Sequence, residues 1–347
     1  MIANQFDYLK NPSSEQLLGS PQAFLARLTM PTIIDIEGAD TDSYRVIVTL
    51  IHGNEPSGLI ALHRWILLTN KYGRKPLTNL RFVIASIEAA QLAPELTHRY
   101  LPGGKDLNRC FGHSKAGGYY DRARLIETAI NEVRPELVVD LHNTSGYGPA
   151  FAVSTSRRAQ DSALASIFCS KMIYTELMLG ALMEQEYHCP TITIECGGSK
   201  DPQSHEIAFQ GIDQLSRYSQ LAECHHLQLV EVLAHPQRVR LKQERSLTYD
   251  LAFNPEYALT VHKDIEQMNF GVTSRGRTLG WLSKDSLEDL VIIDPDGNNL
   301  IAEYFEVKDN ALVAKTDMQL FMATSVKEIA LTDCLFYVTL SPKGTES

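Results

Sequence analysis

Apolar positions in the first two thirds of the chain follow two alternating patterns. Short runs rich in β-branched residues predict strands at Tyr44–Ile51, Leu80–Ile87, Leu137–Leu141, Phe151–Val153 and Thr191–Glu195. Segments with helical spacing lie among them, at Leu59–Leu68, Asp121–Val133 and Asp161–Leu182. Residues 1–30 are expected to form a short helical lead-in, with Pro21 as a first helical residue after Ser20. Strands that alternate with helices are typical of a mostly parallel sheet in an α/β fold.

The pattern changes near residue 235. Proline and glycine then punctuate short segments of alternating apolar and polar residues, at 257–262, 277–283, 287–294, 298–307 and 334–340. Helical spacing is not evident there. We therefore expect an α/β domain over residues 1–235 and a smaller β-rich domain over residues 236–347, which suits a length of 347 residues.

Composition narrows the class of protein without indicating its chemistry. Lys and Arg number 32 against 42 Asp and Glu, and the net charge of −10 argues against nucleic acid or an anionic membrane surface as the main partner. No apolar run approaches the roughly 18 residues of a membrane span, and no secretory signal is evident. The six cysteines form no CxxC pair, so we expect reduced thiols in a cytoplasmic protein. The oligomeric state stays open, a homo-oligomer included.

The first candidate for chemistry is His52-Gly53-Asn54-Glu55, which directly follows a predicted strand. Imidazole nitrogen and carboxylate oxygen are ligands that zinc takes in proteins. Two intervening residues let both side chains point at one ion from a tight turn, and we expect Gly53 and Gly58 to provide unusual backbone conformations there. The HxxE spacing alone is weak evidence, because it occurs by chance in many chains.

Two further candidates also end predicted strands. His142, within Asp140-Leu141-His142-Asn143, would supply a third ligand, since ligands bind at the carboxyl ends of strands in open α/β sheets. Two histidines and one glutamate are the ligand set of a catalytic zinc with an open position. Asp140 lies on the same side of the strand as His142 and would accept a hydrogen bond from that imidazole. Glu195 could take a proton from water, although a lone strand-end glutamate more often faces solvent.

A third group of candidates lies in the segment HRYLPGGKDLNRCF. Arg109 offers a bidentate fork for a carboxylate, and Asn108 adds a donor. Arg99 is a second cation of the same segment. The simpler interpretation is a surface loop with ordinary charges.

Other polar and sulfur-containing residues have simpler explanations. His63 is expected to pack within its helix, and Cys110 and Cys196 to behave as small buried hydrophobic residues. The chain has no GxSxG motif for a serine nucleophile. The Gly103-Gly104-Lys105 run lacks the spacing of a phosphate-binding loop.

Four motifs in order, HGNEPSG, RY…DLNRCF, DLHNTSG and TIECGG, resemble those of the succinylglutamate desuccinylase/aspartoacylase family, within the zinc-carboxypeptidase superfamily. Two later segments, VHKDIEQMNFGVTSRGRTLGWL and AEYFEVKDNALVAKT, resemble the second domain of aspartoacylases. The resemblance covers about residues 40–335. It implies a mixed, mostly parallel sheet of zinc-carboxypeptidase type, and a smaller C-terminal β-rich domain that caps the active site.

The resemblance also implies catalytic roles. His52, Glu55 and His142 would hold one Zn²⁺ per chain. Glu195 would be the general base that activates water, and Arg99 would polarise the scissile carbonyl and stabilise its negative charge. The protein would then be a zinc-dependent hydrolase of non-peptide linear amide C–N bonds, a deacylase that cleaves a small anionic N-acyl amino acid.

The same resemblance implies four contacts with substrate. Asn108 and Arg109 would bind a substrate carboxylate, Tyr304 would reach in from the second domain, and Asn143 fits the aspartoacylase form of its motif. Gln185 stands near the place where aspartoacylases carry an arginine for substrate. The acyl group and the amino acid therefore stay open.

Two other functions compete with a deacylase. A metallocarboxypeptidase would use the same zinc and the same Asn-Arg pair to release C-terminal residues from peptides. A non-catalytic relative would bind a metal or ligand on the same fold. Such proteins usually lack a ligand or the base, whereas here all four positions are filled.

Overall fold

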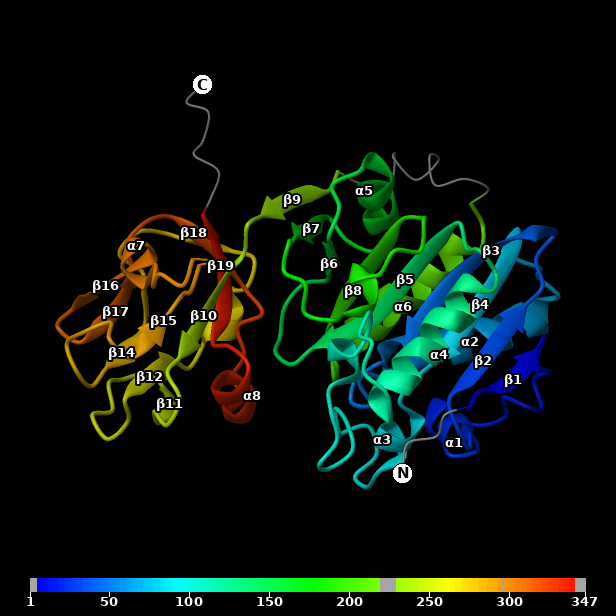
Figure 1. Cartoon of the computed structure of the whole chain (residues 1–347), viewed down its shortest axis with the longest axis horizontal. Coiled ribbons are helices and arrows are strands. Elements are labelled where there is room, and N and C mark those ends of the chain that lie inside the picture. The colour runs from blue at the N-terminus through cyan, green and yellow to red at the C-terminus, as the bar shows by residue number, and fades with distance from the viewer. Residues whose placement is uncertain (1–4, 219–228, 295, 341–347) are drawn as a thin grey trace. The chain divides into compact units, whose positions relative to one another are not determined.

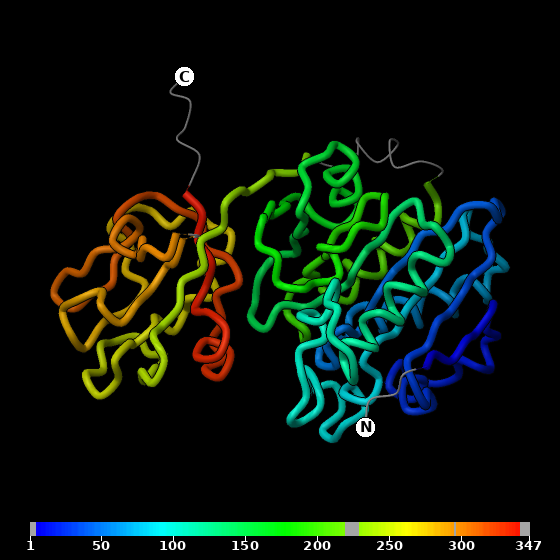
Figure 2. The backbone as a smooth tube through the Cα atoms, viewed as in Figure 1, coloured from blue at the N-terminus to red at the C-terminus, as the bar shows by residue number. Residues whose placement is uncertain are grey.

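The computed structural model describes residues 5–218, 229–294 and 296–340. The chain forms two compact units, residues 1–143 with 150–232, and residues 144–149 with 233–347. It therefore enters the second unit twice, briefly after residue 143 and again after residue 232. Figure 2 traces the backbone, coloured by residue number.

A nine-stranded sheet, most of which lies in the first unit, positions the candidate site (Figure 1). Its strands are, in spatial order, β1 (Asp7–Lys10), β2 (Thr32–Ile36), β4 (Thr78–Ile84), β3 (Asp40–Thr49), β5 (Leu137–Thr144), β8 (Thr191–Gly198), β6 (Phe151–Ser154), β7 (Lys171–Tyr174) and β9 (Glu231–Ala234). Among the pairs with a described register, β1–β2, β3–β4, β3–β5 and β6–β7 are parallel, and β2–β4 and β6–β8 are antiparallel. The sheet is thus mixed, and parallel pairs predominate among these.

Helices cover both faces of this sheet. They are α1 (Pro21–Leu25), α2 (Ser57–Tyr72), α3 (Ile87–Gln91), α4 (Tyr119–Asn131), α5 (Ala159–Ser166) and α6 (Pro202–Leu215). One apolar cluster joins α1, α2, α5 and α6 to strand residues such as Ile47 and Val139. Another joins α4 to Val46, Val48 and Val138. Because successive strand residues point to opposite faces, these two clusters lie on the two sides of the sheet.

The helical lead-in expected for residues 1–30 is only partly correct. α1 begins as predicted, because Pro21 is its first residue and the Ser20 side chain accepts a hydrogen bond from the Ala23 N–H. However, Asp7–Lys10 is β1, paired in parallel with β2. A four-residue strand has too few positions to reveal its period in the sequence.

The helix predicted over Asp161–Leu182 is wrong for most of its length. α5 ends at Ser166, and β7 follows as a strand of the large sheet. Leu182–Glu184 forms a single 3-10 turn, η2. β7 exists because it pairs with β6, a tertiary contact that outweighs the local helical spacing.

The second unit is rich in strands, as expected. One five-stranded sheet comprises β13 (Val272–Thr273), β18 (Met318–Phe321), β19 (Phe336–Leu340), β10 (Gln237–Leu241) and β15 (Leu290–Val291). The other comprises β11 (Leu247–Asp250), β12 (Leu259–His262), β14 (Thr278–Leu282), β17 (Ala311–Ala314) and β16 (Phe305–Lys308). The expectation that helices are absent is wrong, since η4 (Ile265–Met268), α7 (Ile301–Tyr304) and α8 (Lys327–Thr332) lie here.

Residues 144–149, which begin with the last residue of β5, are held within the second unit. The Tyr147 N–H donates to Glu266 Oε2 at 2.8 Å, and Asn269 Nδ2 donates to the Tyr147 carbonyl at 2.9 Å. A Cβ on Gly146 would lie 2.8 Å from the Ala323 carbonyl oxygen, so this close approach requires glycine.

Within the part of the chain that the structure describes, no helix combines the length and apolar character needed to cross a membrane.

Candidate functional site

Two neighbouring parallel strands bring the candidate metal ligands together. β3 pairs with β5 so that Thr49 lies opposite Leu141, and His142 follows Leu141 along β5. Beyond β3 the buried residue Leu50 adopts a left-handed conformation, with φ of 53°. This conformation is uncommon outside glycine and turns the chain out of the strand direction. The segment with His52 and Glu55 then leads into α2.

The two glycines of this turn serve close packing rather than unusual dihedral angles, which corrects the sequence expectation. A Cβ on Gly53 would lie 2.6 Å from the Ala90 backbone nitrogen. A Cβ on Gly58 would overlap Thr49, whose Oγ1 would be 2.2 Å away. Leu50, not a glycine, carries the positive φ next to this turn.

His52, Glu55 and His142 form a buried cluster whose ligand atoms all lie within 4.8 Å of one another. The Nδ1 of His52 is 2.9 Å from Glu55 Oε1, and the Nδ1 of His142 is 2.7 Å from Glu55 Oε2. The two imidazoles therefore present the same nitrogen to one carboxylate. This arrangement brings the three predicted ligands to one point.

Each histidine of the cluster has an aspartate oxygen within hydrogen-bond distance of its Nε2, the ring nitrogen that faces away from Glu55. The Nε2 of His142 lies 2.7 Å from Asp140 Oδ2, as the sequence predicts. The Nε2 of His52 lies 2.8 Å from Asp106 Oδ1, a partner that the sequence reasoning missed. Carboxylates on the outer nitrogens fix the tautomer and the ring orientation of ligating histidines.

The electrostatics of the cluster suit a bound cation. Burial raises the pKa of Glu55, but His52 and His142 oppose it and hold this pKa well below its usual range. Burial likewise raises the pKa of Asp106, yet His52 and Arg99 bring it well below its usual range. Burial lowers the pKa of His142, whereas Asp140 and Glu55 raise it well above its ordinary value. Several carboxylates thus surround two imidazoles, and positive charge among them is favoured.

Glu195 sits in β8, within electrostatic reach of all three candidate ligands. Its Oε2 is buried and has no hydrogen-bond partner among the described residues. Burial raises its pKa to about 7; His142 opposes the rise and Glu55 adds to it. A carboxyl group with this pKa can both accept and release a proton near neutrality.

Arg99 lies directly beside the candidate ligands. Its Nη1 donates to Glu55 Oε1 at 3.2 Å, and its Nη2 donates to Asp106 Oδ2 at 3.0 Å. The Arg99 carbonyl accepts from the Gly53 N–H at 3.0 Å, which joins its loop to the turn after β3. About 40% of its side-chain surface stays exposed.

Asn108 and Arg109 lie in η1 (Leu107–Arg109), which Asp106 caps by accepting from the Asn108 N–H. The buried Asn108 side chain accepts a hydrogen bond from the Leu182 N–H at 3.0 Å. Arg109 is half-buried and close enough to Asp106 to lower the pKa of that carboxyl. Gln185 lies against Gly112, a few residues after η1.

The two remaining predicted substrate contacts are engaged inside the protein. The side-chain amide of Asn143 bonds to the backbone and hydroxyl of Ser57 and to the Gly197 carbonyl. Tyr304 is buried in the apolar core of the second unit. Their contact with substrate stays a prediction.

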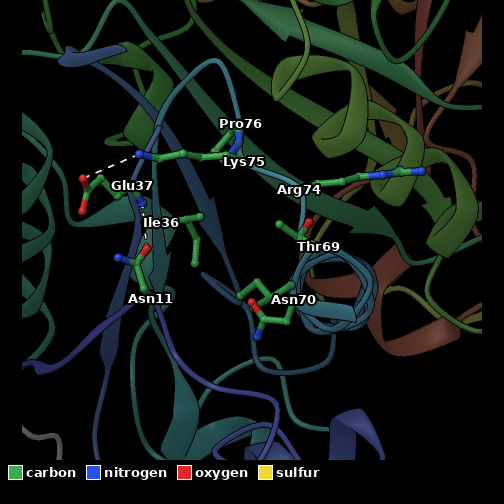
Figure 3. Close-up of a pocket in the computed structure, with 9 residues that line it drawn as sticks. Asn11, Ile36, Glu37, Thr69, Asn70, Arg74, Lys75 and Pro76 are labelled. Atoms are coloured by element: carbon green, nitrogen blue, oxygen red, sulfur yellow. Dashed lines mark hydrogen bonds and ion pairs between the residues drawn. The ribbon is translucent and has the colours of Figure 1, made fainter. Parts of the chain in front are cut away.

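A separate polar cavity of about 270 Å³ lies near the C-terminal end of α2 (Figure 3). Lys75 pairs there with Glu37 at 3.7 Å, and Arg74 extends away from that pair. His52 and Glu55 precede the other end of this 16-residue helix, which spans about 24 Å. The cavity is therefore not part of the candidate site.

His63, also on α2, is buried and bonds to the Leu17 carbonyl, which confirms its packing role.

The fold and the site together define an α/β protein with a buried His–Glu–His cluster at the ends of parallel strands. Residues 45–217 match the succinylglutamate desuccinylase/aspartoacylase catalytic domain. The chain belongs to this family, and the resemblance drawn from its motifs is confirmed.

Solved structures with the same fold extend over most of the chain. A succinylglutamate desuccinylase/aspartoacylase from Rhodobacter sphaeroides is 14% identical, with a TM-score of 0.56, over 91% of this chain and 89% of that one. The ectoine utilization protein EutE (DoeB) from Ruegeria pomeroyi is 17% identical, with a TM-score of 0.58, over 90% and 88%. Murine aminoacylase 3 is 15% identical, with a TM-score of 0.51, over 87% and 95%. No curated protein sequence gave a match.

Proposed function

We propose that this protein is a zinc-dependent amidohydrolase that removes the acyl group from a small N-acyl amino acid. The main support for the proposal is that each histidine of the cluster faces Glu55 with one ring nitrogen and an aspartate with the other. Two histidines present Nδ1 to Glu55 while Asp106 and Asp140 hold their Nε2 atoms. Membership of a desuccinylase and aspartoacylase family supports the same reaction class.

The donor set fits zinc. Two imidazole nitrogens and one carboxylate are a ligand set of catalytic zinc sites, and carboxylates behind the histidines are typical of them. The Nδ1 atoms of His52 and His142 and the carboxylate of Glu55 would hold one ion per chain. When bound, zinc supplies a Lewis acid that polarises a carbonyl and makes water more acidic. The assignment to a sheet of zinc-carboxypeptidase type is part of this proposal.

Glu195 is the proposed general base. Its unpartnered Oε2 would take a proton from the attacking water and then give it to the departing amine. A single carboxyl group that acts first as a base and then as an acid works best when its pKa lies near the working pH. Burial raises the pKa of Glu195 above its ordinary value, in the direction that this double role requires.

Arg99 is the proposed electrophilic partner. Its guanidinium, held by Glu55 and Asp106, would donate to the carbonyl oxygen of the substrate as negative charge develops there. Loss of one such donor typically costs about 10²–10³ in rate.

Arg109 and Asn108 are the proposed anchors for the substrate carboxylate. The protein carries a net charge of −10, so its overall field repels an anion and a local cation must capture it. We also propose that Asn143 and Tyr304 contact the substrate. The proposal further includes a cytoplasmic location, which the free thiols support.

The test is a substrate panel on protein loaded with one equivalent of zinc. N-acetyl and N-succinyl amino acids are compared with N-blocked dipeptides that have a free C-terminus, and released amine is measured. We expect hydrolysis of N-acyl amino acids. Preferential cleavage of the dipeptides would instead establish a carboxypeptidase, and hydrolysis of neither group would favour a non-catalytic relative.

A matched pair of variants tests the base. Glu195→Gln should keep its zinc while activity falls by about 10²–10⁴-fold. Glu186→Gln alters an exposed glutamate of the loop before β8 and should leave activity unchanged. A Glu195→Gln enzyme with wild-type turnover would remove Glu195 from the mechanism.

A further inference from the structure

Asn143 connects three elements that carry candidate catalytic residues. Its Oδ1 accepts from the Ser57 N–H at 3.1 Å, at the start of α2, directly after the Glu55 turn. Its Nδ2 donates to the Gly197 carbonyl at 2.9 Å, in β8 beyond Glu195. Asn143 itself follows His142 in β5, and its backbone N–H donates to Glu55 Oε2 at 3.2 Å. One amide thus ties the turn after β3, the end of β5 and the end of β8.

The hydroxyl of Ser57 completes this set of bonds. The second Nδ2 proton of Asn143 goes to Ser57 Oγ at 2.8 Å. Ser57 Oγ therefore accepts from Asn143, and its own proton must go to another atom. The Nδ1 of His205, on α6, lies 2.8 Å from this oxygen. Among the described residues the Ser57 hydroxyl has no other acceptor within hydrogen-bond distance, so we assign His205 Nδ1 as the acceptor, which places the imidazole proton on Nε2.

The surroundings favour this neutral form. Ser57 is fully buried and His205 is half-buried. Burial lowers the pKa of His205, and Asp201 opposes the shift only in part. A buried hydroxyl that loses its acceptor costs free energy, so the bond to His205 fixes the direction of the whole series of hydrogen bonds.

We infer that His205 is a positioning residue for the candidate metal centre. By accepting the Ser57 hydroxyl proton, it orients the Asn143 amide, which in turn holds the Glu55 turn and the His142 strand in their relative positions. The hydrogen bond of His205 goes to Ser57 rather than to a candidate ligand, so it acts through Ser57 and Asn143. The inference rests on the proposed function for its catalytic consequence, but not for its effect on metal binding.

The decisive measurement is zinc affinity, by competition with a chromogenic chelator. His205→Ala removes the acceptor and should weaken zinc binding by about tenfold, at the lower end of losses from outer partners of metal ligands. His205→Asn places an oxygen near the position of Nδ1 and should restore most of the affinity. On a substrate from the panel, His205→Ala should lower kcat by about tenfold and leave KM unchanged, since the proposed role of His205 is to position the cluster and not to bind substrate.

Two controls separate positioning from general stability. His63→Ala removes another histidine of the first unit, whose bond to Leu17 lies away from the cluster. It should lower the melting temperature without changing zinc affinity. The double variant Ser57→Ala/His205→Ala should bind zinc no more weakly than Ser57→Ala alone, because the effects of two substitutions that remove the same bond are not additive. If His205→Ala is insoluble, His205→Leu fills the same space without an acceptor.

Wild-type zinc affinity in His205→Ala or His205→Leu would overturn the inference. Equal weakening in His205→Asn would overturn the role of the hydrogen bond. If the wild-type protein hydrolyses no member of the panel, the proposed function fails, while the zinc affinities still decide whether His205 positions the cluster.

Discussion

Replacement of Asp140 by alanine tests the support behind His142 most directly. Asp140 is fully buried, and its Oδ2 lies 2.7 Å from His142 Nε2. A metal ion on Nδ1 requires the imidazole proton to sit on Nε2, where Asp140 accepts it. In Asp140→Ala this buried donor has no acceptor, and the ring loses the contact that orients it.

The expected magnitude follows from the type of bond. A hydrogen bond to a charged group contributes about 1.5–3 kcal/mol, and each 1.4 kcal/mol is about tenfold in affinity. We expect Asp140→Ala to weaken zinc binding by about 10–100-fold, as for other outer partners of metal ligands. Asp140→Asn keeps an acceptor oxygen but loses the charge. Since charge about doubles such a bond, roughly half of the free energy should be lost, or about 3–10-fold in affinity.

The assay is competition with a chelator of known affinity, with metal content checked by elemental analysis. Asp161→Ala is the matched control, because Asp161 is also fully buried. Asp161 lies in α5 and accepts a hydrogen bond from Arg158, just before that helix, rather than from a candidate ligand. It should lower the melting temperature with unchanged zinc affinity. The reasoning is refuted if Asp140→Ala binds zinc as the wild type does, or if Asp161→Ala weakens binding equally.

Three further expectations concern the whole chain. Zinc at 100 times its dissociation constant should stabilise the wild type by about 2.7 kcal/mol, seen as a higher melting temperature, and His142→Ala should abolish this shift; an equal shift in the variant would exclude His142 as a ligand. In a Cys224→Ser background the five described cysteines should resist a thiol reagent at neutral pH, because burial raises each pKa and the thiolate is the reactive form. Labelling of Cys189 should rise only as the pH approaches its pKa of about 11, and rapid labelling near pH 7 would contradict this. Gly211→Ala should destabilise the fold by about 1–2 kcal/mol in chemical denaturation, because a Cβ would lie 1.9 Å from the Phe168 ring and overpacking exceeds the gain in helix propensity; unchanged stability would show that the ring moves aside freely.

Local patterns in the sequence were sufficient for part of this fold and site. The long, β-branched runs that became β3, β4, β5 and β8 are buried along most of their length, so their composition alone indicates a strand. His142 ends such a run, and Asp140 shares its face because side chains two apart in a strand point the same way. The candidate ligands could therefore be found from spacing and strand ends.

Other features depend on residues that are far apart in the chain. Asp106 and His52 are 54 residues apart in the sequence, and His205 and Ser57 are 148 apart. No local spacing in the sequence therefore predicts either bond. β1 and β7 are strands because a neighbouring strand pairs with them, whatever their own short pattern favours. The sequence by itself determined which side chains can bind a metal and which segments form the buried strands. Only the tertiary structure decided which carboxylate supports each histidine and why Gly53 must be small, because packing brings these groups together from distant parts of the chain.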